Sequence, residues 1–154
     1  MKTILILILA FQLQAQTAKT TLGKVLLSIE IDHVSIFVNS VYKNAKKISD
    51  STNIPIAIII GQSALETKYG QSRRCIEDKN YFGVKRNHKY MVYKNKDQSF
   101  VDYAKVLCQK CYTDKNPETL QDWYTALEEC GYFTSKTYIK KLNNIIFRFN
   151  IDLL

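Results

Sequence analysis

One apolar stretch, I-P-I-A-I-I-I-G-Q-S-A-L-E-T-K-Y-G at 54–70, constrains the fold more than any other part of the chain. Pro55 suits a first helical position, because its missing N–H would have no partner there, and Asn53 can help to cap the helix. Gly70 can end the helix in the left-handed conformation. Since the residues between them are apolar on nearly every side, the stretch predicts a central helix that the rest of the domain buries.

A single carboxylate, Glu66, lies near the C-terminal end of this predicted helix. Apolar surroundings and the negative end of the helix dipole both disfavour the charged form, so they raise the pKa of the carboxyl. A carboxyl with a raised pKa is what a general acid for glycoside cleavage requires. The alternative is an exposed glutamate paired with Lys68 or Lys85, because exposed glutamates are common.

Three blocks follow one another in the order A-L-E-T-K-Y-G-Q-S at 64–72, N-Y-F-G-V-K at 80–85 and G-Y-F-T-S-K-T-Y-I-K-K-L at 131–142. Their wording resembles the glucosaminidase family of peptidoglycan hydrolases, which includes flagellar muramidase-like proteins and many autolysins. The resemblance runs from about Phe37 to Ile146. It implies a mostly α (α+β), lysozyme-like helical domain around a central buried helix, with a small, reduced β-lobe. It also implies that Glu66 is the catalytic acid.

The resemblance suggests two further catalytic residues. Tyr132 matches the tyrosine of the family's G-Y-x-T block, where a hydroxyl could stabilise charge that develops on the sugar. Asp102 matches the aspartate of S-F-x-D-Y-A. A capping box formed by Ser99 and Asp102 at the start of a helix explains the same aspartate without any chemistry.

A second carboxylate is missing where larger members of the family place it, in a β-lobe hairpin. Between Phe82 and Ser99 the only acidic residue is Asp97. Three explanations stay open: Asp97 or Asp102 positions a water molecule, the 2-acetamido group of the substrate acts as the nucleophile, or the protein binds glycan without cleaving it.

Several aromatic and polar residues near these blocks are candidates for contacts with a sugar chain. Tyr90, Val92 and Tyr93 predict a short strand, with a turn at 86–89 before it. Tyr90 and Tyr93 either stack on sugars or serve as ordinary strand aromatics. The predicted substrate-binding residues are Gln62, Tyr69, Phe82, Tyr90 and Tyr93.

The first fifteen residues resemble a signal peptide, with Lys2 at the start, an apolar run at 4–11 and a small-residue cleavage site at 13–15. The apolar run is too short to span a bilayer well. We therefore expect a signal peptide at 1–15, one domain at 16–154, no stable membrane insertion, and a secreted or periplasmic protein.

The chain has four cysteines, and an even number in an exported protein favours disulfides. Two bridges allow three pairings, and the sequence does not choose among them. Cys108 and Cys111 lie one helical turn apart, so we expect each to pair elsewhere. A zinc site at C-x-x-C is the alternative, but the usual second pair of ligands is missing. The predicted disulfide cysteines are Cys75, Cys108, Cys111 and Cys130.

Three further helices are predicted from apolar spacing and capping residues. The first is amphipathic, with Val34, Val38, Val41, Ala45 and Ile48 on one face. The second starts at Asn116-Pro117-Glu118 and buries Leu120, Trp123, Tyr124 and Leu127. The third is capped by Thr134 or Ser135 and buries Tyr138, Leu142, Ile145, Ile146 and Phe149.

Composition restricts the partners. A net charge of +8 favours a polyanion, and in the absence of a nucleic-acid motif we expect peptidoglycan glycan strands rather than nucleic acid. We predict a monomeric, exported hydrolase of β-1,4 bonds in these strands, of the endo-β-N-acetylglucosaminidase type, without cofactor or metal. A non-catalytic binding or inhibitory module, muramidase specificity and a membrane-active basic protein are the alternatives.

Overall fold

The computed structural model describes residues 2–111 and 117–151, with side chains from residue 16 onward except at 31. The chain divides into two compact units, Met1–Ser35 and Ile36–Leu154. The first unit consists of the earlier part of helix α1 (Lys2–Thr52), which passes without a break through the predicted signal peptide and through 25–31. Among the described residues, no helix combines the length and the apolar character that a membrane crossing needs.

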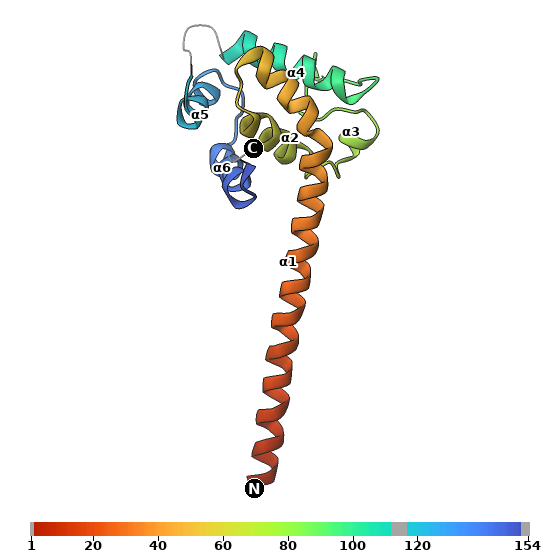
Figure 1. The fold of residues 1–154 in the computed structure, drawn as a ribbon, viewed down its shortest axis with the longest axis vertical. Helices are drawn as coiled ribbons and strands as arrows, with labels where there is room; N and C mark the ends of the chain where they lie inside the picture. Colours follow the sequence, from red (N-terminus) through yellow and green to blue (C-terminus); the bar gives the residue numbers. More distant parts are fainter. Residues whose placement is uncertain (1, 112–116, 152–154) are drawn as a thin grey trace. The chain divides into compact units, whose positions relative to one another are not determined.

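The second unit contains the last turns of α1 and the elements that follow it. These are α2 (Ile56–Thr67), α3 (Arg73–Ile76), β1 (Lys85–Arg86), β2 (Lys89–Tyr90), α4 (Lys96–Cys111), α5 (Leu120–Glu129) and α6 (Tyr138–Arg148) (Figure 1). Within the described residues, these two short strands form one sheet and the other regular elements are helices. The predicted mostly helical domain with a reduced β-lobe is therefore confirmed.

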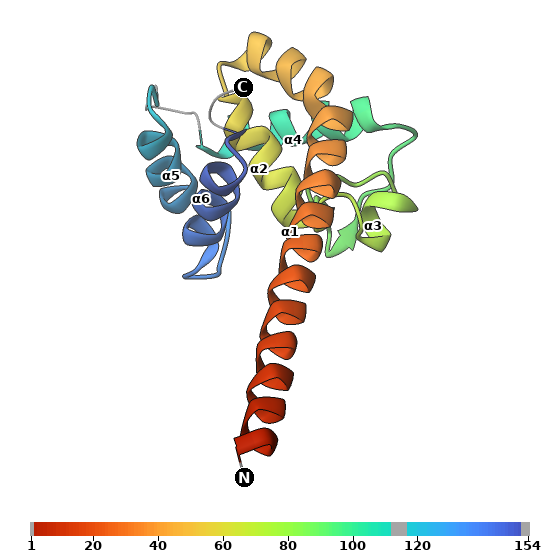
Figure 2. The same ribbon diagram turned by 60° about the horizontal axis from the view of Figure 1, so that its bottom comes forward.

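Helix α2 lies at the centre of the second unit, between α6 and the last turns of α1 (Figures 1 and 2). Every residue from Ala57 to Ala64 is buried, as the apolar run predicts. Gly61 allows α6 to approach closely, because a Cβ at this position would lie 2.8 Å from Leu142 Cδ1 and 2.9 Å from Ile146 Cγ1. The glycine within an otherwise aliphatic run thus has a packing role.

The ends of α2 differ from the prediction. Asn53 adopts a left-handed conformation and donates its N–H to Ser49 O, so it ends α1 and does not cap α2. Pro55 occupies the N-cap position of α2. At the other end, Lys68 and Tyr69 already have positive φ angles of 51° and 56°, so α2 ends before Gly70.

The last turns of α1 bury the face that the apolar spacing predicts. Phe37, Val41, Ala45 and Ile48 belong to the core, and the intervening lysines are exposed. The predicted amphipathic helix is confirmed here.

Helix α4 begins four residues earlier than predicted, with its cap at Asn95 and not at Ser99. Asn95 accepts a hydrogen bond from the Gln98 N–H (3.0 Å), and Gln98 accepts one from the Lys94 N–H (3.0 Å). This Asn-x-x-Gln pattern starts the helix. Ser99 lies inside α4 and accepts from the Tyr81 N–H (3.0 Å), so the proposed Ser99–Asp102 capping box was wrong.

The starts of α5 and α6 also differ from their predictions. Thr119 and Asp122 form the capping box of α5. The predicted start is therefore wrong, and its first residue, Asn116, lies outside the described residues. Thr137 precedes α6, without a side-chain capping bond. The predicted inward faces are correct: Trp123, Tyr124 and Leu127 are buried in α5, and Tyr138, Leu142 and Ile146 are buried in α6.

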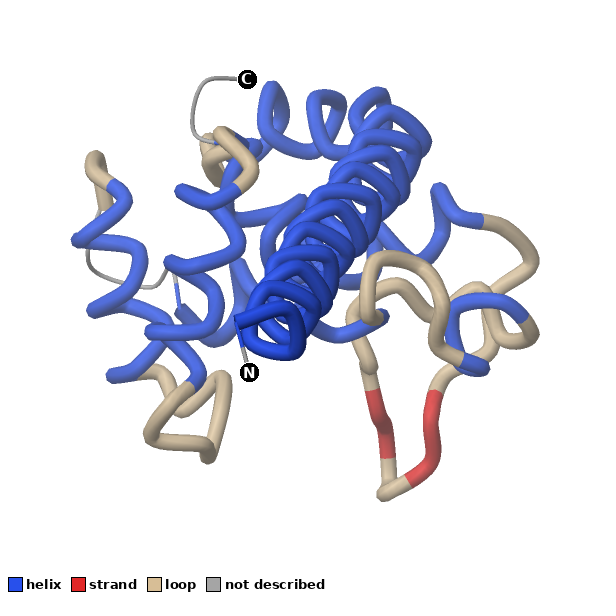
Figure 3. Tube along the Cα trace, turned by 90° about the horizontal axis from the view of Figure 1, so that it is seen from below, coloured by secondary structure: helices blue, strands red, loops and turns tan. Residues whose placement is uncertain are grey.

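The β-hairpin pairs Lys85 with Tyr90 and Arg86 with Lys89 (Figure 3). Its two turn residues, Asn87 and His88, have φ angles of 49° and 61°, as a type I′ turn requires. The buried Asn80 amide holds the base of the hairpin, because it donates to Val84 O (2.9 Å) and Met91 O (3.0 Å) and accepts from Val84 N (3.0 Å).

One of the two predicted disulfides is present. Cys111, at the end of α4, is bonded to Cys130, which follows α5 (S–S 2.10 Å). This bond rules out the alternative of a zinc site at Cys108-x-x-Cys111, and the described residues contain no group of three or more potential metal ligands.

The second predicted bridge is wrong, because Cys75 and Cys108 are both free thiols. The Cys75 thiol contacts Tyr81 and lies near Lys96, at the beginning of α4. Cys108 lies three turns further along the same helix, which corresponds to about 18 Å. Two cysteines must have Cα atoms within about 7 Å to be bridged, so this arrangement keeps the two thiols apart.

Candidate active site

A cavity of about 600 Å³ opens at the C-terminal end of α2. Its walls come from three segments that are far apart in the sequence: α2 with α3, the β-hairpin, and the stretch that leads into α6. We call it the Glu66 cavity. Its lining residues are Glu66, Ser72, Arg74, Asn80, Gly83, Lys85, Tyr90, Tyr132, Phe133, Thr134, Ser135 and Tyr138.

Glu66 is an exposed residue that lines this cavity, as the alternative of an exposed glutamate expects. Burial raises the pKa of the Glu66 carboxyl above its ordinary value of 4.5, and a hydrogen bond from Tyr138 partly opposes the rise. The expected direction of the pKa shift is therefore present. Tyr138, and neither Lys68 nor Lys85, is the hydrogen-bond partner that influences this carboxyl.

A chain of side-chain hydrogen bonds fixes the orientation of Tyr138. The Tyr103 hydroxyl donates to Gln62 Oε1 (2.5 Å), which leaves Gln62 Nε2 to donate to the Tyr138 hydroxyl oxygen (3.2 Å). Because that oxygen already accepts a bond, the Tyr138 proton is free to point at Glu66. Gln62 is fully buried, so this arrangement is part of the core.

Tyr132 lies in the same cavity, directly after the turn that ends α5. Gly131 has a φ of 65° and the Tyr132 N–H donates to Leu127 O (3.1 Å), which turns the chain toward Glu66. Burial and the negative charge of Glu66 raise the pKa of the Tyr132 hydroxyl, so it stays protonated at neutral pH. A protonated phenol can donate a hydrogen bond to a substrate atom.

Gly83 brings the backbone of the hairpin against the carboxylate. Its φ is 62°, and a Cβ at this position would lie 3.3 Å from Glu66 Oε2. Glycine is favoured here by both conformation and space.

Four of the five predicted substrate-binding residues lie elsewhere, and Tyr90 is the one that lines the Glu66 cavity. Gln62 and Phe82 are buried, and the Phe82 ring stacks on Tyr103 with centroids 3.8 Å apart. Tyr69 packs edge-on against Phe37 and Phe149. Because Gln62 and Phe82 are buried, their side chains are not accessible to a sugar. Tyr69 does not line the Glu66 cavity.

Asp102 and Tyr93 line a different cavity, of about 380 Å³, which we call the Asp102 cavity. Asp102 accepts hydrogen bonds from Arg86 Nη2 (2.5 Å) and from the Tyr93 hydroxyl (2.7 Å). Asp97 lines this cavity too, and is bonded to the Asn44 amide. The structure therefore does not bring Asp97, Asp102 or Tyr93 to the Glu66 cavity, and of the described residues that line it, Glu66 alone carries a carboxylate.

A third hollow, of about 790 Å³, lies between the last turns of α1 and the start of α4. Lys43, Lys46 and Lys47 line it, and Lys46 is paired with Asp50 (2.9 Å). It is larger than the Glu66 cavity but shares none of its lining residues.

Sequence reasoning missed several residues of the Glu66 cavity. Tyr138 was assigned to the core, which is correct for its ring but omits the bond from its hydroxyl to Glu66. Asn80, Gly83 and Lys85 all belong to the N-Y-F-G-V-K block, so that block was the available signal. Arg74 lay in a polar segment without any pattern that indicated a site.

Comparison with known proteins identifies the family of the chain. The family described as mannosyl-glycoprotein endo-β-N-acetylglucosaminidase (Glucosaminidase) matches residues 42–151. The exo-glucosaminidase LytG of Bacillus subtilis (strain 168) is 23% identical to this chain over an alignment of 152 residues. The match covers 80% of this chain and 54% of LytG. The chain thus spans about half the length of this curated relative.

Solved structures share the fold. The catalytic domain of the autolysin Auto from Listeria monocytogenes is 22% identical, covers 79% of this chain with 86% of its own length, and has a TM-score of 0.66. The glycoside hydrolase domain of Salmonella typhimurium FlgJ is 22% identical, with coverages of 78% and 90% and a TM-score of 0.65. A peptidoglycan hydrolase from Sphingomonas sp. A1 is 26% identical, with coverages of 72% and 86% and a TM-score of 0.63.

The family match covers more than half of the chain, and the fold around the Glu66 cavity is the fold of these hydrolase domains. The chain therefore belongs to the glucosaminidase family of peptidoglycan hydrolases, which are glycoside hydrolases.

Proposed function

We propose that this protein is an exported peptidoglycan hydrolase that cleaves the β-1,4 bond on the reducing side of N-acetylglucosamine, with Glu66 as general acid and base. The observation that carries the proposal is the Glu66 carboxyl itself: burial raises its pKa, and it faces a cavity large enough for sugar units. A protonated carboxyl in that position can donate its proton to a leaving glycosidic oxygen.

The second catalytic group is the substrate's own acetamido group. Support comes from the lining of the Glu66 cavity, where the described residues supply no second carboxylate, and from the engagement of Asp102 with Arg86 and Tyr93 elsewhere. Participation of a 2-acetamido oxygen is an established route for glycosidases that lack a nucleophilic carboxylate.

The reaction then has two steps. Glu66 protonates the leaving oxygen while the acetamido oxygen attacks the anomeric carbon from the opposite face, which breaks the glycosidic bond and forms a cyclic oxazolinium ion. Water next attacks the anomeric carbon, Glu66 takes the proton of that water, and the acetamido group is restored. Tyr132 donates a hydrogen bond that orients the acetamido group. This route retains the anomeric configuration.

Export belongs to the same proposal. Residues 1–15 read as a signal peptide, and the Cys111–Cys130 bond suits an oxidising compartment outside the cytoplasm. We expect the mature protein to act as a monomer on glycan strands.

Digestion of purified peptidoglycan, followed by borohydride labelling, tests the bond. We expect labelled glucosaminitol, which arises from N-acetylglucosamine at the new reducing end. Labelled muramic acid would assign a muramidase instead, and binding without any new reducing ends would indicate a non-catalytic module.

Proton NMR of the fresh product tests the mechanism separately. Retention gives an initial β-anomer. An initial α-anomer would exclude the acetamido route and would return attention to Asp97 or Asp102 as the base that activates water.

A further inference from the structure

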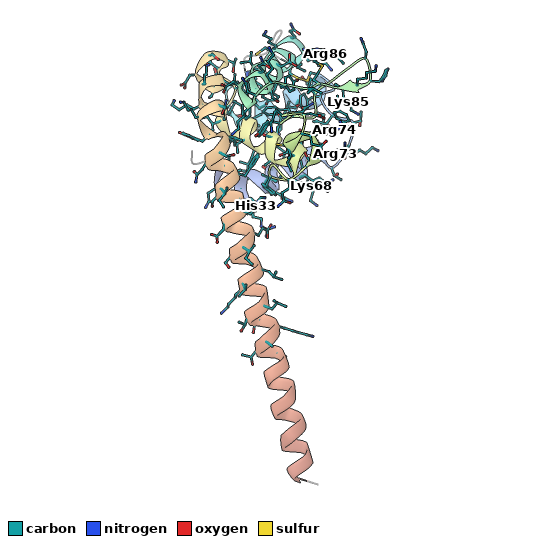
Figure 4. All side chains as sticks on the ribbon, turned by 90° about the vertical axis from the view of Figure 1, so that its right-hand side faces the viewer. His33, Lys68, Arg73, Arg74, Lys85 and Arg86 are labelled. Atoms are coloured by element: carbon teal, nitrogen blue, oxygen red, sulfur yellow. A yellow bond between two sulfur atoms is a disulfide. The ribbon has the colours of Figure 1, made fainter. Side chains whose placement is uncertain are left out.

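Two cations flank one aromatic ring on a wall of the Glu66 cavity. The Tyr90 ring on β2 has the Arg74 guanidinium 4.5 Å and the Lys85 ammonium 4.3 Å from its centroid. All three side chains line the cavity (Figure 4 labels the two cations). The ring holds both cations in place through cation–π attraction.

Carboxylates of the protein neutralise this wall only in part. Arg74 is paired with Asp78 (2.8 Å), whereas Lys85 takes part in no ion pair among the described residues. The Lys85 side chain is exposed. An anionic group that enters the cavity can therefore contact the Lys85 ammonium and the part of the Arg74 guanidinium that is not paired with Asp78.

Neither cation is among the groups that shift the pKa of the Glu66 carboxyl. A cation close to a carboxylate lowers its pKa, yet the influences on the Glu66 carboxyl are burial and the Tyr138 hydrogen bond. A site for a neutral sugar chain gains nothing from two cations on its wall, so this wall favours a substrate that carries negative charge.

We propose that Arg74, Lys85 and Tyr90 form a subsite for a carboxylate-bearing branch of the glycan, so that the cavity selects strands whose 2-acetamido sugars carry lactyl or peptide carboxylates over neutral strands. The inference rests on the proposed function of the same cavity. The carboxylate accepts charge-assisted hydrogen bonds from the two cations, which the Tyr90 ring holds on this wall.

Binding measured without turnover tests the subsite. The parent protein carries Glu66→Gln, and calorimetry compares its affinity for a soluble peptidoglycan tetrasaccharide with stem peptides and for neutral chitotetraose. The same measurement is then made on the parent with Lys85→Gln and on the parent with both Arg74→Gln and Lys85→Gln. The matched control is Lys43→Gln/Lys47→Gln, which removes the same net charge from the hollow beside α1.

We expect the double variant to lose at least about tenfold in affinity for the anionic tetrasaccharide and less than twofold for chitotetraose, with Lys85→Gln in between. The control should change neither affinity by more than about twofold, apart from a weak effect of salt. Equal losses on both ligands, no loss at all, an equal loss in the control, or no binding of the anionic ligand by the parent would each overturn the subsite.

Failure of the proposed function gives a different result. If the chain with Glu66 intact binds the anionic tetrasaccharide through Lys85 but releases no reducing ends, the hydrolytic function fails while the subsite stands. Thermal unfolding of each variant checks that Arg74→Gln, which also breaks the pair with Asp78, leaves the fold intact.

Discussion

Glu66 and Asp102 are two carboxylates in opposite settings. Glu66 lies at the end of a buried helix, where burial raises the pKa of its carboxyl and one neutral tyrosine donates to it. Asp102 lies on α4 with only 15% of its side chain exposed, yet it is paired with a guanidinium (2.5 Å) and accepts from Tyr93 as well. No cation of the described residues forms an ion pair with Glu66, whereas Asp102 has both a cation and a second donor.

The difference separates a chemical role from a structural one. A carboxyl that burial pushes toward its neutral form holds a proton that it can release to a leaving group. A carboxylate whose oxygens are occupied by Arg86 and Tyr93 ties the hairpin to α4 and has little capacity left for a water molecule. The predictions below test this contrast.

Loss of the proton donor should have the largest effect. Glu66→Gln keeps the shape of the side chain, and we expect turnover of purified peptidoglycan to fall by at least about 10²-fold, as is typical when general acid help is removed. Reducing-end release measures the rate, and circular dichroism confirms the fold. Activity close to that of the unchanged protein would remove Glu66 from the mechanism.

Removal of the Tyr138 hydroxyl should have the next largest effect. The bond from Tyr138 lowers the pKa of the Glu66 carboxyl, so Tyr138→Phe should raise it further. Activity that depends on protonated Glu66 falls as the pH rises through this pKa. The descending limb of kcat/KM should therefore move to higher pH, and kcat should drop about tenfold because a charge-assisted bond is lost.

The pH profile of Tyr138→Phe is the measurement, and Tyr124→Phe is its control, since the Tyr124 hydroxyl bonds to Asn143 on the other side of α6. A limb that moves to lower pH would contradict the assigned direction of the hydrogen bond.

Substitution of the second carboxylate should affect activity little. Asp102→Asn and Asp97→Asn should each keep peptidoglycan turnover within about twofold. Asp102→Asn should lower the free energy of unfolding only slightly, since Arg86 is half exposed and solvent screens the pair. Urea unfolding and a turnover assay on the same preparations measure both. A hundredfold loss of turnover in either variant would make that aspartate catalytic.

The smallest effect concerns stability. Because the pKa of the Glu66 carboxyl is higher in the folded state, its contribution to stability is full below the unfolded-state pKa and is lost as the pH rises through the folded-state pKa. Glutamine does not titrate. The difference in unfolding free energy between Glu66→Gln and the unchanged protein should therefore shift in favour of the variant as the pH rises above 4.5, the ordinary pKa of the carboxyl. A shift in favour of the unchanged protein would contradict the direction of the pKa change.

The sequence predicted the parts of the fold that depend on local pattern. The apolar run before Glu66, the spacing of Val41, Ala45 and Ile48, and the inward face of α6 each followed from side-chain periodicity. Helix starts were less predictable, because competing caps lie a few residues apart. In the folded protein Asn95 caps α4 in place of Ser99. Thr119 caps α5 in place of Asn116.

The candidate site was predictable where a motif marked it and unpredictable where it depends on contacts between motifs. Glu66 and Tyr132 lie in the blocks that carry the family resemblance. The hydrogen bond from Tyr138, the place of Arg74 beside Tyr90, and the burial of Gln62 and Phe82 depend on how distant segments pack, which no single segment encodes.

The Cys111–Cys130 bond has a consequence for a protein exposed to proteases. Glu66 and the cations of its cavity precede Cys111, whereas Tyr132 and Tyr138 follow Cys130. A peptide bond cut anywhere between the two cysteines divides the chain into one fragment with the acid and another with the tyrosines, and the disulfide keeps them joined. A nicked protein thus retains every residue of the Glu66 cavity in a single covalent molecule until a reductant separates its halves.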